Sequence, residues 1–436
     1  MGKIFLYFIL ACITLASNAQ AQGIVFEHDN FATVKAKAKA QKKMIFIDFY
    51  TAWCGPCKRM AETTFKNDSV GSFFNQHFIS TKIDAEKGEG RQLAAAYGVS
   101  VYPTFLFLDE DGHLYKKGIG YTVDTAFISI ANTAVQEFVK PDNLIKLAVA
   151  YPTKKTDTAF LRLYMSKLAE NKQPATAVIE QYLSVQKSMQ PGSKPMLDFL
   201  TKYWYQLTLG GKADYILKQY DSAYKQLADS AQRVLLTSGL HAHMFRTQAY
   251  AAETKNPELL KVYIRARKSR PEAERAFFNE QEAWLDYYRA SGQWDIYRRL
   301  ANKWLDSISA TLHPLPDSLD NINPFKRNPM SATVIAYKHA AGVVSDNAKI
   351  YYLQFPNEAG VLDKVKKWVA ASIPVNKTNA FALSFYANLL YTAGDTTAAI
   401  QMKERSLKSF PQVSLHRDIA QGNLVRMQHG EILEEE

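Results

Sequence analysis

The residues of this sequence best suited to chemistry are two cysteines, Cys54 and Cys57, in the stretch "YTAWCGPCKRM". The chain has 436 residues and three cysteines, and the third, Cys12, lies near the N-terminus. Two thiols separated by two residues commonly act as zinc ligands, as a structural disulfide or as a redox pair. Each use makes its own demand on the surrounding sequence.

Zinc binding is disfavoured because the sequence offers too few further ligands. A structural zinc site takes four ligands, usually two cysteine pairs or one pair with two suitably spaced histidines. The only close histidine couple, His241 and His243, is typical of an ordinary helix surface. We therefore expect no metal and no other cofactor. The histidines nearest the cysteines form no spaced couple: His28, His77 and His113.

A purely structural disulfide explains the cysteine pair no better. A bridge across so small a loop restricts the unfolded chain little and therefore stabilises the fold weakly. Redox chemistry remains, and for it the short spacing is an advantage. One thiolate attacks a disulfide, and its neighbour can reach the resulting mixed disulfide to resolve it.

The cysteines also lie where a thiolate is stabilised. They follow "MIFIDFY" (44–50), an apolar run expected of a strand buried on both faces, and they open a predicted helix. Unpaired N–H groups and the helix dipole favour an anion there. We expect Cys54 to be the exposed attacking thiol and Cys57, one turn further, the shielded resolving thiol. Pro56 suits an early helical position.

The surrounding region alternates between strand and helix patterns, which predicts a central sheet covered on both faces. Asp111-Gly112 marks a turn that could join two of the strands as a hairpin. The expected strands are 44–50, 77–84, 104–112 and 114–121, and the expected helices are 29–42, 56–66, 69–76, 89–97 and 122–138.

Beyond Pro141-Asp142-Asn143 the sequence shows almost no strand signal. Amphipathic helices are instead joined by short turns, as in "LAENKQPATAVIEQYL", "AAETKNPELLKVYI", "YYRASGQWDIYRRL" and "LLYTAGDTTAAIQM". Repeated helix–turn–helix units are typical of an α-solenoid. We therefore predict an all-helical domain over residues 141–436.

The last of these units resembles a tetratricopeptide repeat. Ala387, Gly394, Ala399 and Pro411 stand where such repeats place small residues and a closing proline. Small residues let two helices approach closely, and glycine relieves the turn. The other units match less well, so a generic helical bundle remains the alternative.

The first domain carries a more specific resemblance. "FIDFYTAWCGPCK" resembles the active-site stretch of the thioredoxin family, and "VYPTFLFLDEDG" is similar to the segment that supplies the family's cis-proline. The stretch 64–90 is closer to the thioredoxin-like C-terminal domain of the bacterial transmembrane electron relay DsbD. The likeness implies an α/β thioredoxin fold, a mixed sheet flanked by helices, over residues 22–140.

The same resemblance implies roles for individual residues. Asp48 matches the family's buried carboxylate, whose raised pKa lets it accept the resolving thiol's proton. Trp53 would form an apolar rim for the substrate, and Pro103 would present backbone to an extended substrate segment. The other implied substrate contacts are Gly55, Pro56, Tyr102 and Thr104.

Two positions depart from the thioredoxin pattern. Tyr50 stands where many thioredoxins have a second tryptophan, and Ser80 where a lysine often accompanies the buried carboxylate. These differences leave the fold and chemistry in place but put the family's usual pKa tuning in doubt.

Composition narrows the range of partners. Apolar residues make up 47% of the chain and charged residues 22%, an ordinary globular balance. The net charge of +11 arises mainly after residue 140. It indicates a solvated helix surface, or else an anionic partner or an acidic envelope surface. No basic stretch interleaved with aromatic residues suggests nucleic acid, so we expect none as a partner.

The N-terminus reads as an export signal over residues 1–21. Lys3 precedes an apolar stretch, and Ala19-Gln20-Ala21 offers small residues for cleavage. We expect a soluble protein exported to the bacterial periplasm. "ILAC" also resembles a loose lipoprotein box, so anchoring through a lipid on Cys12 is the alternative.

These observations predict an exported thiol–disulfide oxidoreductase that reduces protein disulfides. A membrane electron donor would keep it reduced, and the helical domain would bind the client or the donor as a protein partner. One alternative is a non-catalytic scaffold that uses the helical array. Another is a disulfide oxidase or isomerase with the same residues working in the opposite direction.

Overall fold

The computed structural model describes residues 23–238, 240–275, 278–316 and 329–433. The expected export signal and Cys12 lie outside the described residues. The chain divides into two compact units, one ending at Tyr182 and the other beginning at Leu183. The change from α/β to all-helical structure comes earlier, after residue 139, so the first unit also contains helices that follow the α/β domain.

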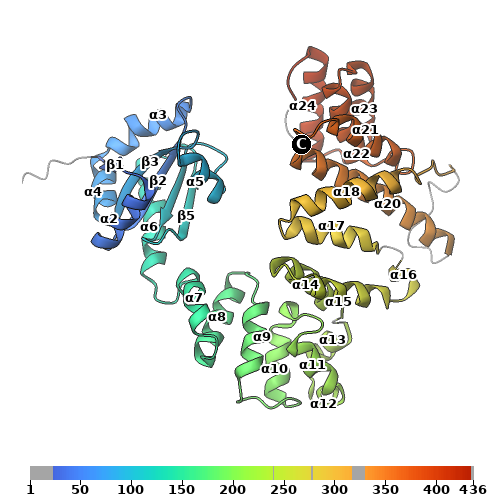
Figure 1. Ribbon diagram of the computed structural model, residues 1–436, viewed down its shortest axis with the longest axis horizontal. Helices are drawn as coiled ribbons and strands as arrows, with labels where there is room; N and C mark the ends of the chain where they lie inside the picture. Colours follow the sequence, from blue (N-terminus) through green and yellow to red (C-terminus); the bar gives the residue numbers. More distant parts are fainter. Residues whose placement is uncertain (1–22, 239, 276–277, 317–328, 434–436) are drawn as a thin grey trace, which may run out of the picture. The chain divides into compact units, whose positions relative to one another are not determined.

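The α/β domain is built on a five-stranded sheet with the order β1-β3-β2-β4-β5 (Figure 1). Strand β2 lies at its centre, parallel to β3 and antiparallel to β4. Strands β4 and β5 form the expected antiparallel hairpin. The strands are β1 (Phe26–Glu27), β2 (Met44–Tyr50), β3 (Phe78–Asp84), β4 (Thr104–Leu108) and β5 (Leu114–Ile119).

Helices cover both faces of this sheet, as the alternating pattern predicts. One buried cluster joins α2 and α5 to Ile45, Ile47 and Phe49 of β2. The other joins α3, α4 and α6 to Met44 and Phe46 of the same strand. The helices are α2 (Phe31–Gln41), α3 (Gly55–Glu62), η1 (Thr64–Lys66), α4 (Asp68–His77), α5 (Gly90–Ala96) and α6 (Asp124–Val139).

After α6 the described residues contain helices and turns but no strand. The first unit continues with α7 (Leu144–Ala150), η2 (Tyr151–Thr153) and α8 (Thr158–Glu170), and the boundary after Tyr182 falls within α9 (Thr176–Val185). The second contains α10 (Lys194–Lys202), η3 (Trp204–Gln206), α11 (Lys212–Gln219), α12 (Asp221–Leu227), α13 (Ser230–Ser238), α14 (Leu240–Glu253), α15 (Pro257–Lys268), α16 (Glu272–Arg275), α17 (Glu280–Ala290), α18 (Trp294–Ser309), α20 (Pro329–Gln354), α21 (Val361–Ser372), α22 (Ala380–Thr392), α23 (Thr396–Ser409) and α24 (Leu415–His429).

Four of the expected helix–turn–helix joints share one turn geometry. The second residue past the end of the first helix adopts a left-handed conformation, and these residues are Lys172, Lys255, Gly292 and Gly394. In each case the next residue donates its backbone N–H to a carbonyl five positions earlier, which ends the helix in a Schellman motif. The joints read from the sequence as tight turns are therefore confirmed as repeats of one local structure.

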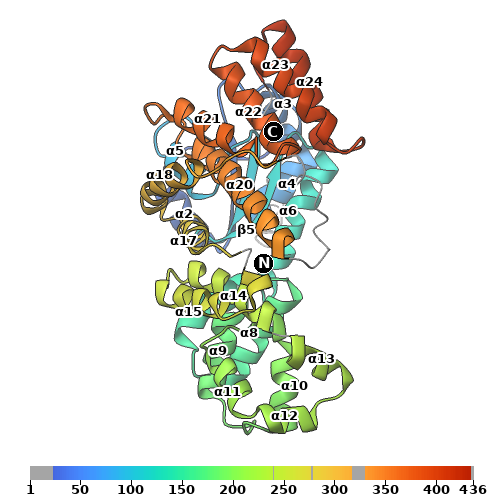
Figure 2. The same ribbon diagram turned by 90° about the vertical axis from the view of Figure 1, so that its right-hand side faces the viewer.

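The last helical pair packs as closely as its small residues predict. Ala387 of α22 and Ala399 of α23 are both fully buried between the helices. Within the second unit, helices from α14 onward pack mainly on their neighbours in sequence, as in stacked repeats, and α22 to α24 lie side by side (Figure 2). The specific tetratricopeptide resemblance stays a prediction. In the part of the chain that is described, no helix is long and apolar enough to cross a membrane.

Candidate redox-active site

The cysteine pair stands at the start of α3, directly after the loop that leaves β2. Cys54 and Cys57 form a disulfide with Cα atoms 5.3 Å apart. Cys54 is the N-cap residue, and its Sγ accepts a hydrogen bond of 3.1 Å from the backbone N–H of Cys57. Pro56 occupies an early helical position, as predicted. The sulfur of Cys54 therefore accepts a backbone hydrogen bond at the positive end of the helix, which favours a thiolate there.

The expected difference in exposure between the two cysteines is wrong for the disulfide form. Both Cys54 and Cys57 are only 3% exposed. The capping hydrogen bond turns the side chain of Cys54 back over the helix start rather than out to solvent. Gly55 and Pro56, between them, are exposed, and open space surrounds the Cα of Gly55. Two exposed residues therefore separate the buried cysteines, and their contact with a substrate stays a prediction.

Asp48 is fully buried on the side of the sheet that α3 covers. Side chains alternate along β2, so Asp48 shares a face with Phe46, which packs against Met60 of α3. Neither carboxylate oxygen has a hydrogen-bond partner among the described residues. Desolvation raises the pKa of Asp48 from 3.8 to about 6, although the charge of Lys82 opposes this effect. The carboxylate at this position is therefore buried with a raised pKa, and its role as a proton acceptor stays a prediction.

Lys82 of β3 supplies the cation that thioredoxins often carry at the position of Ser80. Its Nζ lies 3.6 Å from Asp48 Oδ2, an ion pair too long for a hydrogen bond. The two residues are direct partners in the β2–β3 register. Ser80 lies two residues earlier on the same face of β3 and is buried. The lysine is therefore present in this chain, but two positions later along the strand than in many thioredoxins.

Aromatic rings hold the ammonium group of Lys82 in place. Its Nζ lies 5.1 Å from the ring centroid of Tyr50, 5.6 Å from that of Phe65 and 5.7 Å from that of Phe26. Each ring presents the negative face of its quadrupole to a nearby cation. Tyr50, the other position that departs from the thioredoxin pattern, therefore lies beside the Asp48–Lys82 pair.

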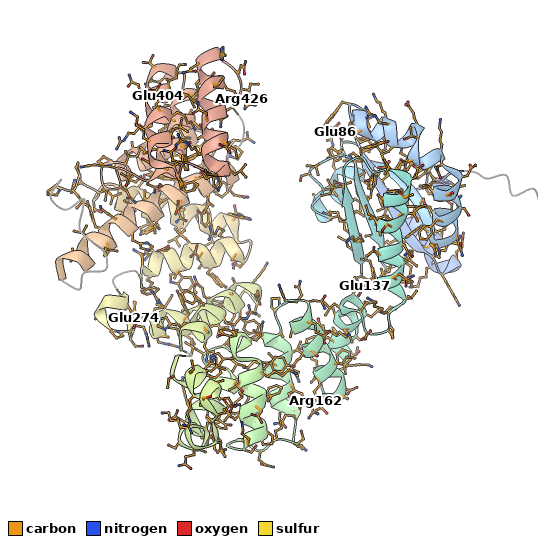
Figure 3. All side chains as sticks on the ribbon, turned by 180° about the vertical axis from the view of Figure 1, so that it is seen from behind. Glu86, Glu137, Arg162, Glu274, Glu404 and Arg426 are labelled. Carbon is orange, nitrogen blue, oxygen red and sulfur yellow. A yellow bond between two sulfur atoms is a disulfide. The ribbon has the colours of Figure 1, made fainter. Side chains whose placement is uncertain are left out.

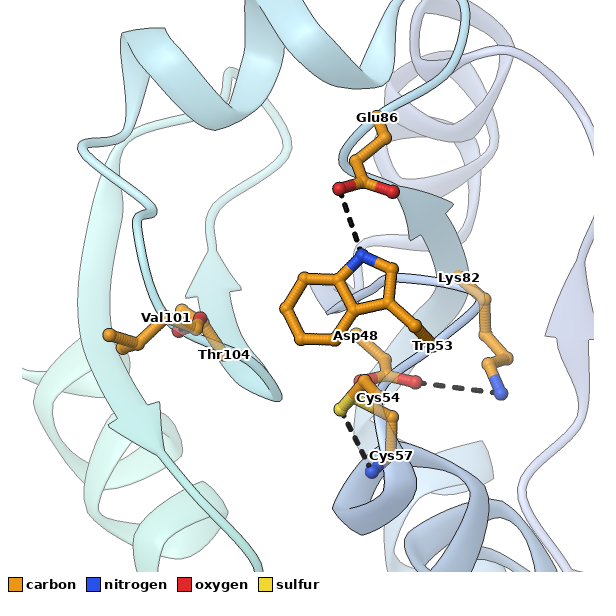
Figure 4. Close-up of a disulfide and its surroundings, with 8 residues drawn as sticks. All are labelled: Asp48, Trp53, Cys54, Cys57, Lys82, Glu86, Val101 and Thr104. Carbon is orange, nitrogen blue, oxygen red and sulfur yellow. Dashed lines mark hydrogen bonds and ion pairs between the residues drawn. A yellow bond between two sulfur atoms is a disulfide. The ribbon is translucent and has the colours of Figure 1, made fainter. Parts of the chain in front are cut away.

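Trp53 lies at the surface beside the cysteines, with 68% of the residue exposed. Its indole N–H donates a hydrogen bond of 3.0 Å to Glu86 Oε1 (Figure 4). Its ring stands edge to face with Tyr102 at a centroid distance of 6.0 Å. Trp53 thus presents an exposed ring beside the cysteines, and its contact with a substrate stays a prediction. Glu86 was not singled out from the sequence, because only the fold brings the turn after β3 to this tryptophan.

Pro103 precedes β4 and follows a cis peptide bond from Tyr102, as the resemblance implies. Its carbonyl already accepts a hydrogen bond from Gly120 N–H, and a proline has no backbone N–H to donate. Thr104 Oγ1 donates to the Val101 carbonyl at 2.7 Å, which closes the loop (Figure 4). No described residue accepts a hydrogen bond from Val101 N–H or Tyr102 N–H.

The chemistry open to this site is thiol–disulfide exchange with proton transfer. Two sulfurs can bond to each other, the helix start stabilises a thiolate, and a buried carboxylate of raised pKa can take up a proton. Among the described residues, no group of three or more His, Cys, Asp or Glu side chains is arranged to hold a metal ion.

Comparison with known proteins places these features in a family. A family model described as thioredoxin-like matches residues 27–110. Thioredoxin from Mycoplasma genitalium is 32% identical over 91 residues, which cover 21% of this chain and 82% of that protein. Protein disulfide-isomerase 1 from Dictyostelium discoideum is 29% identical over 152 residues, which cover 34% of this chain. The match spans only 40% of the Dictyostelium protein.

The oxidised C-terminal domain of DsbD from Neisseria meningitidis is a related solved structure. It is 26% identical, with a TM-score of 0.21, and the match covers 22% of this chain and 86% of that domain. A cysteine pair at a helix start, a cis-proline before β4 and a mixed five-stranded sheet define a thioredoxin-like redox domain. The chain belongs to the thioredoxin family.

Proposed function

We propose that this protein is an exported thiol–disulfide oxidoreductase that reduces disulfides in client proteins. The observation that carries the proposal is the Cys54–Cys57 disulfide at the N-terminus of α3, above the buried carboxylate of Asp48. A purely structural bridge needs neither a helix start nor a desolvated proton acceptor. A redox pair benefits from both.

The reaction begins with the dithiol form. The Cys54 thiolate attacks one sulfur of a client disulfide, the client S–S bond breaks, and the second client sulfur leaves as a thiolate. The Cys57 thiolate then attacks Cys54 Sγ, which breaks the mixed disulfide and releases the first client sulfur. The client gains two electrons and two protons, and the Cys54–Cys57 disulfide forms.

Asp48 supports the second of these steps. Cys57 must lose its proton to attack, and a buried carboxylate with a pKa of about 6 can receive it near neutral pH. Lys82 keeps that carboxylate ionised often enough to act, because its positive charge opposes the desolvation of Asp48.

A client segment would bind along the loop before Pro103. The backbone N–H groups of Val101 and Tyr102 are not used within the described residues, and Val101 is 48% exposed. An extended segment can pair with such groups as a short added strand and rest on the indole of Trp53. This geometry brings a client disulfide to the α3 N-terminus.

Export and the partners of the helical domain belong to the same proposal. The segment 1–21 has the features of a secretory signal, which supports export. A membrane protein with a reactive dithiol would return two electrons and two protons to the Cys54–Cys57 disulfide. The helices of residues 141–436 would bind the client or that donor.

The decisive experiment compares two serine variants of the full chain. Cys54→Ser should abolish reduction of insulin disulfides, because the attacking thiol is gone. Cys57→Ser should accumulate clients as mixed disulfides in cells, because the resolving thiol is gone. The absence of such adducts, with the variant folded and exported, would rule out the proposed reaction.

The direction of electron flow is settled by the reduction potential of the Cys54–Cys57 couple. We expect a reducing value nearer to that of thioredoxins than to that of oxidases, since glycine and proline separate the cysteines. A strongly oxidising potential would instead assign the same residues to disulfide formation.

A further inference from the structure

We propose that Glu86 is a positioning residue that holds the Trp53 indole in its client-facing orientation, and that its carboxylate favours clients with a cationic side chain beside the reactive disulfide. This inference rests on the proposed function. It starts from the 3.0 Å hydrogen bond between the indole N–H and Glu86 Oε1, which Figure 4 shows at the edge of the site.

The indole of Trp53 needs an external tether because burial does not fix it. A side chain that is 68% exposed has little packing to select one rotamer. Two contacts restrict it, the hydrogen bond to Glu86 and the edge-to-face contact with Tyr102. Trp53 immediately precedes Cys54 and Tyr102 precedes Pro103, so the ring connects the cysteine loop to the cis-proline loop.

Glu86 can act as an anchor because hydrogen bonds fix the turn in which it lies. Its backbone N–H donates to Asp84 Oδ1 at 3.0 Å, and its carbonyl accepts a hydrogen bond from Arg91 Nε. The preceding residue, Ala85, donates its N–H to the carbonyl of Tyr50 at the end of β2 at 2.9 Å. The anchor is therefore fixed to the same strand end from which the cysteine loop departs.

The Glu86 carboxylate also leaves a negative charge at the rim of the site. Among the described residues it forms no ion pair, and the neighbouring Lys87 pairs with Asp84 at 3.2 Å instead. Glu86 is exposed, and Figure 3 shows it at the surface of the α/β domain. A lysine or arginine of a client lying on Trp53 would approach this charge, whereas an acidic side chain would be repelled.

The test uses two variants of the full chain that separate the tether from the charge. Glu86→Gln keeps an oxygen acceptor for the indole but removes the charge, and Glu86→Ala removes both. Glu110→Gln is the matched control, because Glu110 lies beyond the far end of β4 from Pro103. Each protein is labelled with 5-fluorotryptophan, and Trp53→Phe identifies the Trp53 resonance. Activity is measured on two disulfide peptides that differ only in a lysine or a glutamate beside the cystine.

The expected results differ between the variants. Glu86→Ala should shift and narrow the Trp53 fluorine resonance and raise KM about 3- to 10-fold, while kcat changes less than about 2-fold. Glu86→Gln should keep the resonance but lose the preference for the lysine peptide, which we expect to be about 3- to 10-fold at low salt in the unmodified protein. Glu110→Gln should behave like the unmodified protein.

Each contrary outcome would overturn a different part of the proposal. An unchanged Trp53 resonance and KM in Glu86→Ala would overturn the positioning role. A lysine preference that survives in Glu86→Gln, or is absent from the unmodified protein, would overturn the selectivity. If the unmodified protein reduces neither peptide, the proposed function fails instead, and the fluorine resonance still reports whether Glu86 holds the indole.

Discussion

At the scale of single residues, Asp48 carries the largest electrostatic cost of the site. Desolvation raises its pKa from 3.8 to about 6, so the folded state favours the protonated form. Its contribution to stability is therefore fully present below pH 3.8 and is lost as the pH rises through about 6. At neutral pH the fold holds an ionised carboxylate that it would be more stable without.

Replacing that carboxylate should stabilise the protein and slow its chemistry. Asp48→Asn is expected to raise the free energy of unfolding at pH 7 by about 2–3 kcal/mol, the equivalent of the pKa shift. The same change should slow resolution of mixed disulfides, because the proton acceptor is gone. Urea denaturation at pH 7 and at pH 4 measures the first effect. The gain should fall below about 1 kcal/mol at pH 4 and be absent in the exposed control Glu62→Gln.

Lys82 should control the pH at which Asp48 acts. In Lys82→Met the opposing charge is lost, so the pKa of Asp48 rises further and the rate of mixed-disulfide resolution should reach half its maximum at a higher pH. Rapid-quench kinetics across pH 5 to 9 measures this midpoint. Lys87→Met, which removes a surface lysine paired with Asp84, should leave it in place. Equal midpoints in both variants would contradict the account.

Residue types and spacing identified most of this site, and three of its features needed the fold. Lys82 was missed because a lysine two positions along a strand reaches the same face, so a strict positional match finds only Ser80. The low exposure of Cys54 follows from its capping hydrogen bond. Glu86 is 33 residues from Trp53, and no local pattern links the two.

At the scale of elements, hydrophobic pattern predicted the α/β domain well. The expected strand 44–50 coincides with β2, since a continuous apolar run is the signature of a strand buried on both faces. β1 was missed because it has only two residues and carries no periodic signal. The expected strand 104–112 proved shorter, since β4 ends at Leu108 before the Asp111-Gly112 turn.

The shared turn of the helical pairs gives a paired prediction. Gly394 has φ of 86° and open space around its Cα, so Gly394→Ala meets no clash and pays only conformational strain. We expect it to destabilise the protein by about 1 kcal/mol. Lys255→Gly relieves a lysine at φ 51° and should stabilise by about 0.5 kcal/mol, less because glycine also frees the unfolded chain. Urea midpoints that move in the same direction for both would contradict the shared geometry.

His243 of α14 should make the second unit sensitive to acid. It is only 4% exposed, so the helix-surface position expected for it from the sequence is wrong. Its ring lies against Trp204 at a centroid distance of 4.4 Å and a tilt of 49°, and its Nε2 has no partner among the described residues. Desolvation lowers its pKa, more than the charge of Asp214 raises it, so its contribution to stability is present above the ordinary value of 6.5 and is lost as the pH falls below it. Thermal melting from pH 7.5 to 5.5 should show a smaller loss of stability in His243→Phe, which keeps an aromatic ring against Trp204.

At the scale of the whole molecule, the chain combines a redox domain with a longer all-helical region. The domain limits predicted from the sequence are 22–140 and 141–436, and they mark the change in secondary structure. The compact units instead divide after Tyr182. The difference arises because α7 and α8 belong to the first unit although their pattern is helical. The hydrophobic periodicity of a sequence predicts whether a segment is a helix or a strand. Which helices pack together is seen only in the folded chain.

The central claim is that Cys54 loses its proton readily in the folded protein. The most direct measurement is a titration of the reduced full chain, following thiolate absorbance with Cys57→Ser to isolate the first thiol. We expect the pKa of Cys54 to lie well below the 8.5 typical of free cysteine, because the start of α3 stabilises the anion. A Cys54 thiol that titrates like free cysteine would contradict the assignment of this site to thiol–disulfide exchange.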